Sequence, residues 1–314
     1  MSMPDSWRQR MRLPLICAPM YHVTTPTLVQ AARRAGIMAA LPRANAGSFD
    51  EFDRWLCEIM ADADPATAAP LAVNLSTRMP ADDMERHLDL CRRRGVELII
   101  SATGDPTLLI QRAREHGLKV FSDAVNLRFA TKAIAAGADG IIAIGSGGGG
   151  HSGTVNHLTL VSAVRAMFDG TVVMAGAVSN GRAVRAAEVL GADMAYMGTR
   201  FIATHESGAP PAYKRMLVDA TAADLLYTPN VNGVNANWLK SSFRSFGLDP
   251  DRLPPRLEGV RGHGHLPDEL VPWLNLWSAG QGVEEVRDIV AVEELVRELA
   301  AQYAGACAVR SFGS

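Results

Sequence analysis

The chain has 314 residues, of which 48% are hydrophobic and 20% are charged, and its formal net charge at pH 7 is −2. These values are typical of a soluble globular protein with one large domain or two modest ones. Because nucleic acids and anionic membranes are bound by clustered basic faces, and Lys and Arg are scattered here, we expect neither as a partner. No apolar run is long enough to span a bilayer and residues 1–8 lack the apolar segment of a signal peptide, so we expect a cytoplasmic protein.

An amphipathic helix, a glycine at its end and a short apolar strand recur along the first 200 residues. Glycine is typical of the residue just after a helix, where a left-handed conformation is needed. Strands that alternate with helices pair in parallel, and eight such units close a (βα)8 TIM barrel, whereas an open doubly wound sheet rarely needs eight. We therefore predict an α/β fold with a barrel core at residues 1–204, built on strands at 13–17, 37–41, 71–75, 96–100, 118–121, 140–144, 171–175 and 194–197.

Residues 205–314 carry a weaker pattern, with one amphipathic helix expected over 212–226 and a closing helical segment over 283–303. No set of strands there could form a core of its own. We expect this region to be a mainly helical extension or lid packed on the barrel, with no independent second domain.

A glycine-rich stretch, residues 145–153, follows the strand at 140–144 and contains His151. Glycine lets the main chain approach a flat ligand closely, and histidine exchanges protons near neutral pH. The stretch also matches the Gly-x-Gly-x-x-Gly dinucleotide fingerprint, but that motif opens a helix, whereas His-Ser-Gly follows here. A flexible linker is the other alternative, and it would separate two domains. The barrel pattern continues on both sides, which favours a cofactor loop that carries an acid or base.

Functional residues of a TIM barrel lie just after the carboxyl ends of its strands. The first strand is followed by residues 18–20, the third ends near Asn74, and glycines follow the seventh at Gly176 and the eighth at Gly198. The last two loops of such barrels often hold a phosphate through backbone N–H groups. Structural alternatives remain for three of these residues: a core filler for Met20, a strand-end cap for Asn74 and a helix N-cap for Thr199.

Taken in order, these segments resemble the nitronate monooxygenase family, formerly called 2-nitropropane dioxygenases, which are FMN-dependent barrel enzymes. The resemblance runs from about residue 13 to beyond residue 282, through residues 18–20, 72–75, 148–153, 175–182, 190–193, 197–204 and 277–282. It implies that FMN is the cofactor and that no metal is needed. It also implies a ring site at Ala18, Pro19, Met20, Asn74, Gly149 and Gly150, a phosphate site at Gly176, Ala177, Gly198 and Thr199, a catalytic and substrate-facing His151, and Gln281 near the same pocket.

The chain departs from the family pattern at Ile144, where glutamine is frequent, near Gly147, where an acidic residue is frequent, and at Asn235, where we expect proline. These departures leave the flavin site intact and bear on the substrate. The implied reaction is the oxidation of alkyl nitronates, and of nitroalkanes, by O2 to carbonyl compounds and nitrite. The alternatives are an FMN-dependent enoyl-thioester reductase that uses NADH or NADPH, a flavin reductase, and a flavin-binding module without turnover. The sequence fixes neither the physiological substrate nor the oligomeric state.

Overall fold

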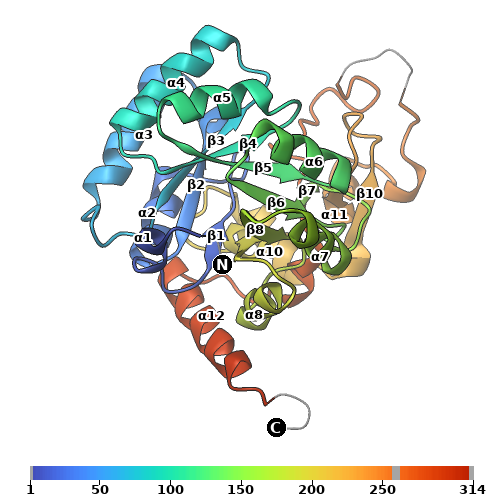
Figure 1. Cartoon of the computed structure of the whole chain (residues 1–314). Coiled ribbons are helices and arrows are strands. Elements are labelled where there is room, and N and C mark those ends of the chain that lie inside the picture. Colours follow the sequence, from blue (N-terminus) through green and yellow to red (C-terminus); the bar gives the residue numbers. More distant parts are fainter. Residues whose placement is uncertain (1–2, 257–261, 311–314) are drawn as a thin grey trace.

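A computed structural model describes residues 3–256 and 262–310, and in it eight parallel strands close into a barrel surrounded by helices (Figure 1). Neighbouring strands follow one another along the chain, and the last pairs with the first through Leu15 opposite Ala195 and Cys17 opposite Met197. The predicted TIM barrel is therefore confirmed, and each of the eight strands overlaps its expected range, although several bounds differ by two or three residues. They are β1 (Leu15–Cys17), β2 (Met38–Pro42), β3 (Leu71–Ser76), β4 (Leu98–Ala102), β5 (Lys119–Ala124), β6 (Gly140–Ile144), β8 (Thr171–Ala175) and β9 (Met194–Met197).

The helices of the barrel begin and end at the residue types that the sequence supplies. Thr25, Ser48 and Asn180 each accept a hydrogen bond from a first-turn N–H of the helix that follows, and Gly137 ends a helix with φ 90°. Such caps satisfy backbone groups that a helix end otherwise leaves unpaired. The helices are α2 (Pro26–Arg34), α3 (Phe49–Ala61), α4 (Ala81–Arg93), α5 (Thr107–Glu115), α6 (Leu127–Ala136), α7 (His157–Met167) and α8 (Gly181–Val189).

The eighth helical position of the ring is filled from the far end of the chain. The helix after β9, α9 (Thr199–Ile202), has only four residues, and α12 (Val292–Cys307) packs instead against α8 and α2. Val292, Leu295, Val296 and Leu299 are buried at helical spacing and join the core between strands and helices. Figure 1 shows α12 beside α8, on the side away from the hairpin strand β10 (Leu225–Thr228). The carboxyl-terminal region thus supplies one barrel helix as well as the candidate lid.

The rest of that region contains strands that the sequence did not reveal. The chain forms α10 (Pro211–Asp219), then β10 and β11 (Ala236–Leu239), which pair antiparallel, and β11 pairs in turn with β7 (Gly150–His151) of the glycine-rich stretch. The single helix expected over 212–226 therefore ends at Asp219. Strands of four residues show little alternation, and this sheet depends on a partner strand some 80 residues away along the chain, a long-range pairing that local patterns do not show. The remaining short elements are α11 (Lys240–Arg244) and the 3-10 turns at Arg43–Asn45, Ala222–Asp224, Pro250–Arg252 and Gln281–Glu285.

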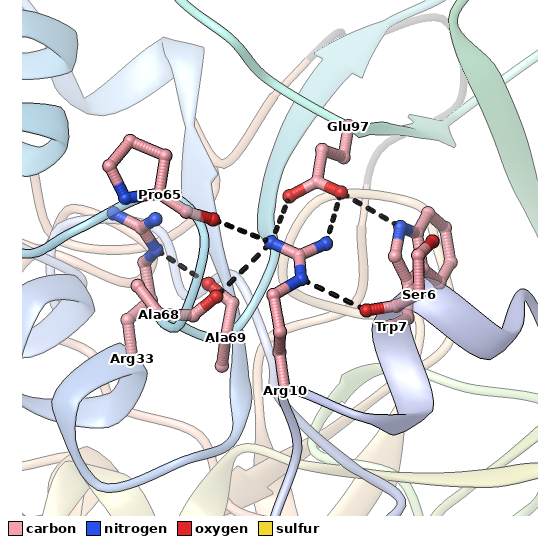
Figure 2. Close-up of polar contacts among 8 residues, drawn as sticks. All are labelled: Ser6, Trp7, Arg10, Arg33, Pro65, Ala68, Ala69 and Glu97. Carbon is pink, nitrogen blue, oxygen red and sulfur yellow. Dashed lines mark hydrogen bonds and ion pairs between the residues drawn. The ribbon is translucent and has the colours of Figure 1, made fainter.

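The amino-terminal end of the barrel is closed by α1 (Asp5–Arg8) and the residues that follow it. Trp7 is buried and packs edge-on against Phe121 of the barrel interior, with 6.0 Å between ring centroids. Its Nε1 donates a hydrogen bond to Glu97 at 3.0 Å. Figure 2 shows the Arg10 guanidinium between the Glu97 carboxylate and the carbonyl oxygens of Ser6, Pro65 and Ala68, all of which accept its hydrogen bonds. Within residues 3–256 and 262–310, no helix is both long enough and apolar enough to cross a membrane.

Arg10→Ala is expected to lower the free energy of unfolding by about 1.5–3 kcal/mol, because it strands a partly buried carboxylate that accepts charge-assisted hydrogen bonds. Urea denaturation of the purified protein measures the change. Arg54→Ala is the matched control, because Arg54 pairs with Glu51 on the surface of α3 and its loss should cost less than about 0.5 kcal/mol. Equal costs for the two variants would contradict the structural role assigned to Arg10.

Candidate functional site

A cavity of about 710 Å³ lies at the carboxyl ends of the barrel strands, a size within the usual range for a small molecule or cofactor. Its lining comes from loops scattered over more than 250 residues of the chain. Eleven of the residues singled out from the sequence line it together: Ala18, Pro19, Met20, Asn74, Gly149, Gly150, His151, Gly176, Ala177, Gly198 and Thr199. Gln281 is not among the lining residues, and its side chain is exposed while its N–H donates to the Gly147 carbonyl at 2.9 Å.

One wall of the cavity is made almost entirely of main chain. Gly176 has φ 107°, and a Cβ there would lie 3.0 Å from the Gly148 nitrogen. A Cβ on Gly149 would lie 2.9 Å from the nitrogen of Gly280 in the returning carboxyl-terminal loop. Glycine is required at both positions, since the backbones touch. The result is a smooth surface on which a ligand can lie against peptide groups.

Two residues of this wall already make a hydrogen bond to another part of the wall. The Ala177 N–H donates to the Gly147 carbonyl at 3.2 Å, and its φ of 55° places a non-glycine residue in the left-handed region, as strained residues at functional sites often are. The Thr199 Oγ1 accepts the Gly280 N–H at 2.9 Å, which leaves its hydroxyl proton available to a ligand. Thr199 can therefore donate to an anion, whereas Ala177 contributes shape.

The floor of the cavity is formed by the last inward-facing residues of the strands. Asn74 of β3 donates from Nδ2 to the Ile100 carbonyl at 3.3 Å, and its amide retains further hydrogen-bonding capacity. Two floor residues were missed at the sequence level: Asp123 of β5 and Tyr196 of β9. Asp123 lies two residues beyond the predicted end of its strand. Extending that strand to its true end would have flagged the residue, because polar residues at the carboxyl ends of barrel strands are functional candidates.

His151 lines the cavity from β7. Its Nε2 lies 3.4 Å from the Nδ2 of Asn232, and its ring meets Trp273 edge-on, with 5.0 Å between centroids. Burial, and then the nearby positive charge of Arg78, hold the pKa of His151 below its ordinary value. The imidazole is therefore neutral at pH 7 and can accept a proton, as a general base must.

A buried asparagine holds the histidine-bearing stretch in place. Asn237 of β11 is 4% exposed, and the two hydrogens of its Nδ2 are shared among three acceptors: the Ser146 carbonyl at 3.1 Å, the Gly148 carbonyl at 2.7 Å and the Ser152 Oγ at 3.1 Å. Its backbone also pairs with Gly150. Asn237 is thus a positioning residue for both the glycine wall and His151. This role was not predicted from the sequence, because the contact joins residues about 90 positions apart.

Comparisons with known proteins agree with this arrangement. A family model described as nitronate monooxygenase matches residues 8–302. A hydroxy-methyl-oxo-octahydroindene-carboxyl-CoA dehydrogenase from Mycobacterium tuberculosis is 33% identical over 70% of this chain and 61% of its own length. The chain spans less than two thirds of three of the curated relatives that it matches, at 45%, 61% and 61% of their lengths.

Two solved structures are similar along nearly their whole length. FabK from Thermotoga maritima superposes with a TM-score of 0.76 and 26% identity, covering 96% of each chain. Nitroalkane oxidase from Streptomyces ansochromogenes superposes with a TM-score of 0.74 and 25% identity, covering 95% of this chain and 97% of that one. With the family model matched across nearly the whole barrel and the glycine and histidine loops on one cavity, the chain belongs to the nitronate monooxygenase family of oxidoreductases.

Proposed function

We propose that this protein is an FMN-dependent nitronate monooxygenase that oxidises alkyl nitronates, and nitroalkanes after loss of their α-proton, with O2 to carbonyl compounds and nitrite. The observation that carries the proposal is the convergence of a glycine wall, a polar floor and a neutral histidine on one cavity of cofactor size. Family membership supports the reaction class, and the similarity to the Streptomyces nitroalkane oxidase supports a nitroalkane-derived substrate.

The residues present fit FMN. The wall at Gly176, Gly198 and Thr199 offers peptide groups and one hydroxyl to a phosphate, and it lies in the loops where barrels of this type bind phosphates. The flat, side-chain-free surface at Gly149 suits a planar ring, and the Asn74 amide on the floor offers donors and an acceptor to ring heteroatoms. When bound, a flavin supplies the electron-accepting chemistry that side chains lack.

His151 would hold or remove the substrate proton. Its lowered pKa keeps the imidazole neutral at neutral pH, so a ring nitrogen can take the α-proton of a neutral nitroalkane. A preformed nitronate has already lost that proton, so the protein only has to position it. Trp273, edge-on to His151, helps to keep water away from the imidazole, and Asn232, close to Nε2, helps to fix the ring orientation.

Steady-state assays of nitrite and aldehyde formation from a primary alkyl nitronate test the proposed reaction. We expect both products in equal amounts, O2 consumption, and no requirement for NADH. A protein that retains FMN but releases no nitrite from any nitronate or nitroalkane would contradict the proposal.

A second candidate is an FMN-dependent oxidoreductase that acts on a CoA thioester with NADH or NADPH. It is favoured by the 33% identical relative, whose name specifies a carboxyl-CoA substrate. Rapid loss of flavin absorbance on adding NADH, without nitronate, would support it. The same result would argue against nitronate oxidation as the main activity.

Asn237→Ala is expected to weaken FMN binding, because three loop acceptors lose their donor and the glycine wall loosens. The stability cost should be about 1–3 kcal/mol, as for other buried groups left without a hydrogen bond. Flavin fluorescence titration gives the FMN Kd, and thermal denaturation gives the stability. Asn126→Ala, which removes the N-cap of α6 at a site that does not line the cavity, is the control for stability loss alone. Equal FMN affinity in both variants would contradict the positioning role.

A further inference from the structure

Asp123 is a carboxylic acid on the floor of the barrel cavity that no part of the proposed chemistry has yet used. Inward and outward residues alternate along β5, so Asp123 shares the interior face with Phe121, which lies in the sealed part of the barrel. Asp123 lies two residues closer to the carboxyl end of the strand than Phe121, and it lines the cavity. A ligand bound in the cavity can therefore contact its carboxyl group.

One oxygen of the Asp123 carboxyl group has no hydrogen-bond partner among the described residues. This oxygen, Oδ1, is fully buried. A buried polar group left unpaired is unfavourable, so such groups in native proteins usually meet a ligand or water. Because Asp123 also lines the cofactor-sized cavity, its carboxyl group is placed to contact a ligand bound there.

The groups around Asp123 favour its protonated form. Burial raises the pKa of its carboxyl to about 7, and no described positive charge offsets that effect. On β9, burial together with Asp123 and the Cys17 thiol raises the pKa of the Tyr196 phenol well above its ordinary value, so this neighbour stays neutral. Arg43 also lines the cavity, but its guanidinium donates to His87 and to the Ala46 carbonyl. His151 lines the same cavity, and burial and Arg78 hold its pKa below the ordinary value, which disfavours a positive charge there.

We propose that Asp123 binds the cofactor directly, donating a hydrogen bond from its protonated carboxyl to an acceptor atom of the flavin ring, and that ionisation of Asp123 weakens the complex. The proposal rests on the FMN site described above. A protonated acid presents a donor, whereas a carboxylate presents only acceptors and would repel ring oxygens and acceptor nitrogens. Protonated Asp123 would therefore favour an edge of the flavin ring that is rich in hydrogen-bond acceptors. This preference is lost when Asp123 ionises as the pH rises.

The direction of the pH effect follows from linkage. If the complex prefers protonated Asp123, binding raises the pKa of the group further. FMN affinity is then full below about pH 7 and falls by up to about tenfold per pH unit above it, until the pKa of the complex is reached.

The test is the FMN Kd of the whole protein, measured by quenching of flavin fluorescence from about pH 6 to about pH 9, for wild type, Asp123→Asn and Asp123→Ala. Asparagine keeps the shape and a donor without ionising, so Asp123→Asn should bind FMN with no loss of affinity above neutral pH. Asp123→Ala should bind more weakly than Asp123→Asn at every pH. The phosphate and ring of FMN titrate identically in all three experiments. The ratio of the wild-type Kd to the variant Kd at each pH therefore reports the effect of Asp123 alone.

Identical pH dependence of the Kd in wild type and Asp123→Asn would overturn the role of Asp123 and leave the FMN site standing. Failure of the wild type to bind FMN at any pH would overturn the proposed function itself, and this proposal with it. Circular dichroism of both variants at each pH verifies that they are folded.

Discussion

His151→Ala is expected to lower kcat/KM for a neutral nitroalkane by about 10²–10⁴-fold, the usual contribution of a positioned general base. The same substitution should affect a preformed nitronate much less, because that substrate arrives without the α-proton. Initial rates of nitrite release with the two forms of one compound measure the difference. A spectral titration with FMN shows that the cofactor is still bound in the variant.

The pH profile adds a second readout for His151. Since burial and Arg78 lower the pKa of the imidazole, the nitroalkane rate should fall only when the pH drops below the ordinary histidine range. Arg78→Gln removes a positive charge, so it should raise the pKa of His151 and shift that acidic limb to higher pH. His116→Ala is the control, because His116 pairs with Glu85 and does not line the cavity. Equal losses with nitroalkane and nitronate, or an unmoved acidic limb in Arg78→Gln, would contradict the general-base role.

Gly176→Ala is expected to raise the FMN Kd by at least about tenfold, equivalent to about 1.4 kcal/mol. The added Cβ meets the Gly148 nitrogen at 3.0 Å, and neither backbone can move without displacing the wall. Alanine is also strained at φ 107°, at a cost of about 1–3 kcal/mol in stability. Equilibrium dialysis with FMN and urea denaturation separate the two effects.

Gly191→Ala is the matched control for Gly176→Ala. Gly191 has nearly the same φ, 102°, but it lies at the end of α8, and an added Cβ would meet the aliphatic part of the Arg165 side chain. It should lose similar stability and bind FMN as the wild type does. If both variants bind FMN normally, the glycine wall does not contact the cofactor.

The barrel could be predicted from sequence because each of its units carries its own local signal. Each unit can be recognised from its own stretch of sequence, by an apolar strand and by a glycine after the helix, as at Gly137 before β6. The barrel then constrains the site, since it brings the carboxyl ends of all strands to one face. Asn74, His151 and Gly176 were found on that basis, before any distance between them was known. Their roles toward FMN stay predictions.

The remaining features depend on contacts between distant segments. Asn237 can be identified as a positioning residue only once β11 is known to pair with β7. Likewise, α12 can be identified as a barrel helix only once α9 is known to be too short to fill that position. Gln281 lies beside Gly147, a lining residue of the cavity, although Gln281 itself does not line it. Its role toward the substrate stays a prediction.

An anaerobic titration of the FMN-loaded protein with a primary alkyl nitronate, followed by flavin absorbance, tests the account most directly. We expect the oxidised flavin absorbance to decrease with nitronate and to be unchanged by NADH alone. Reduction by NADH and not by nitronate would contradict the assignment and favour a thioester reductase. A protein that takes up no FMN would contradict the proposed cofactor site, including the role of the glycine wall.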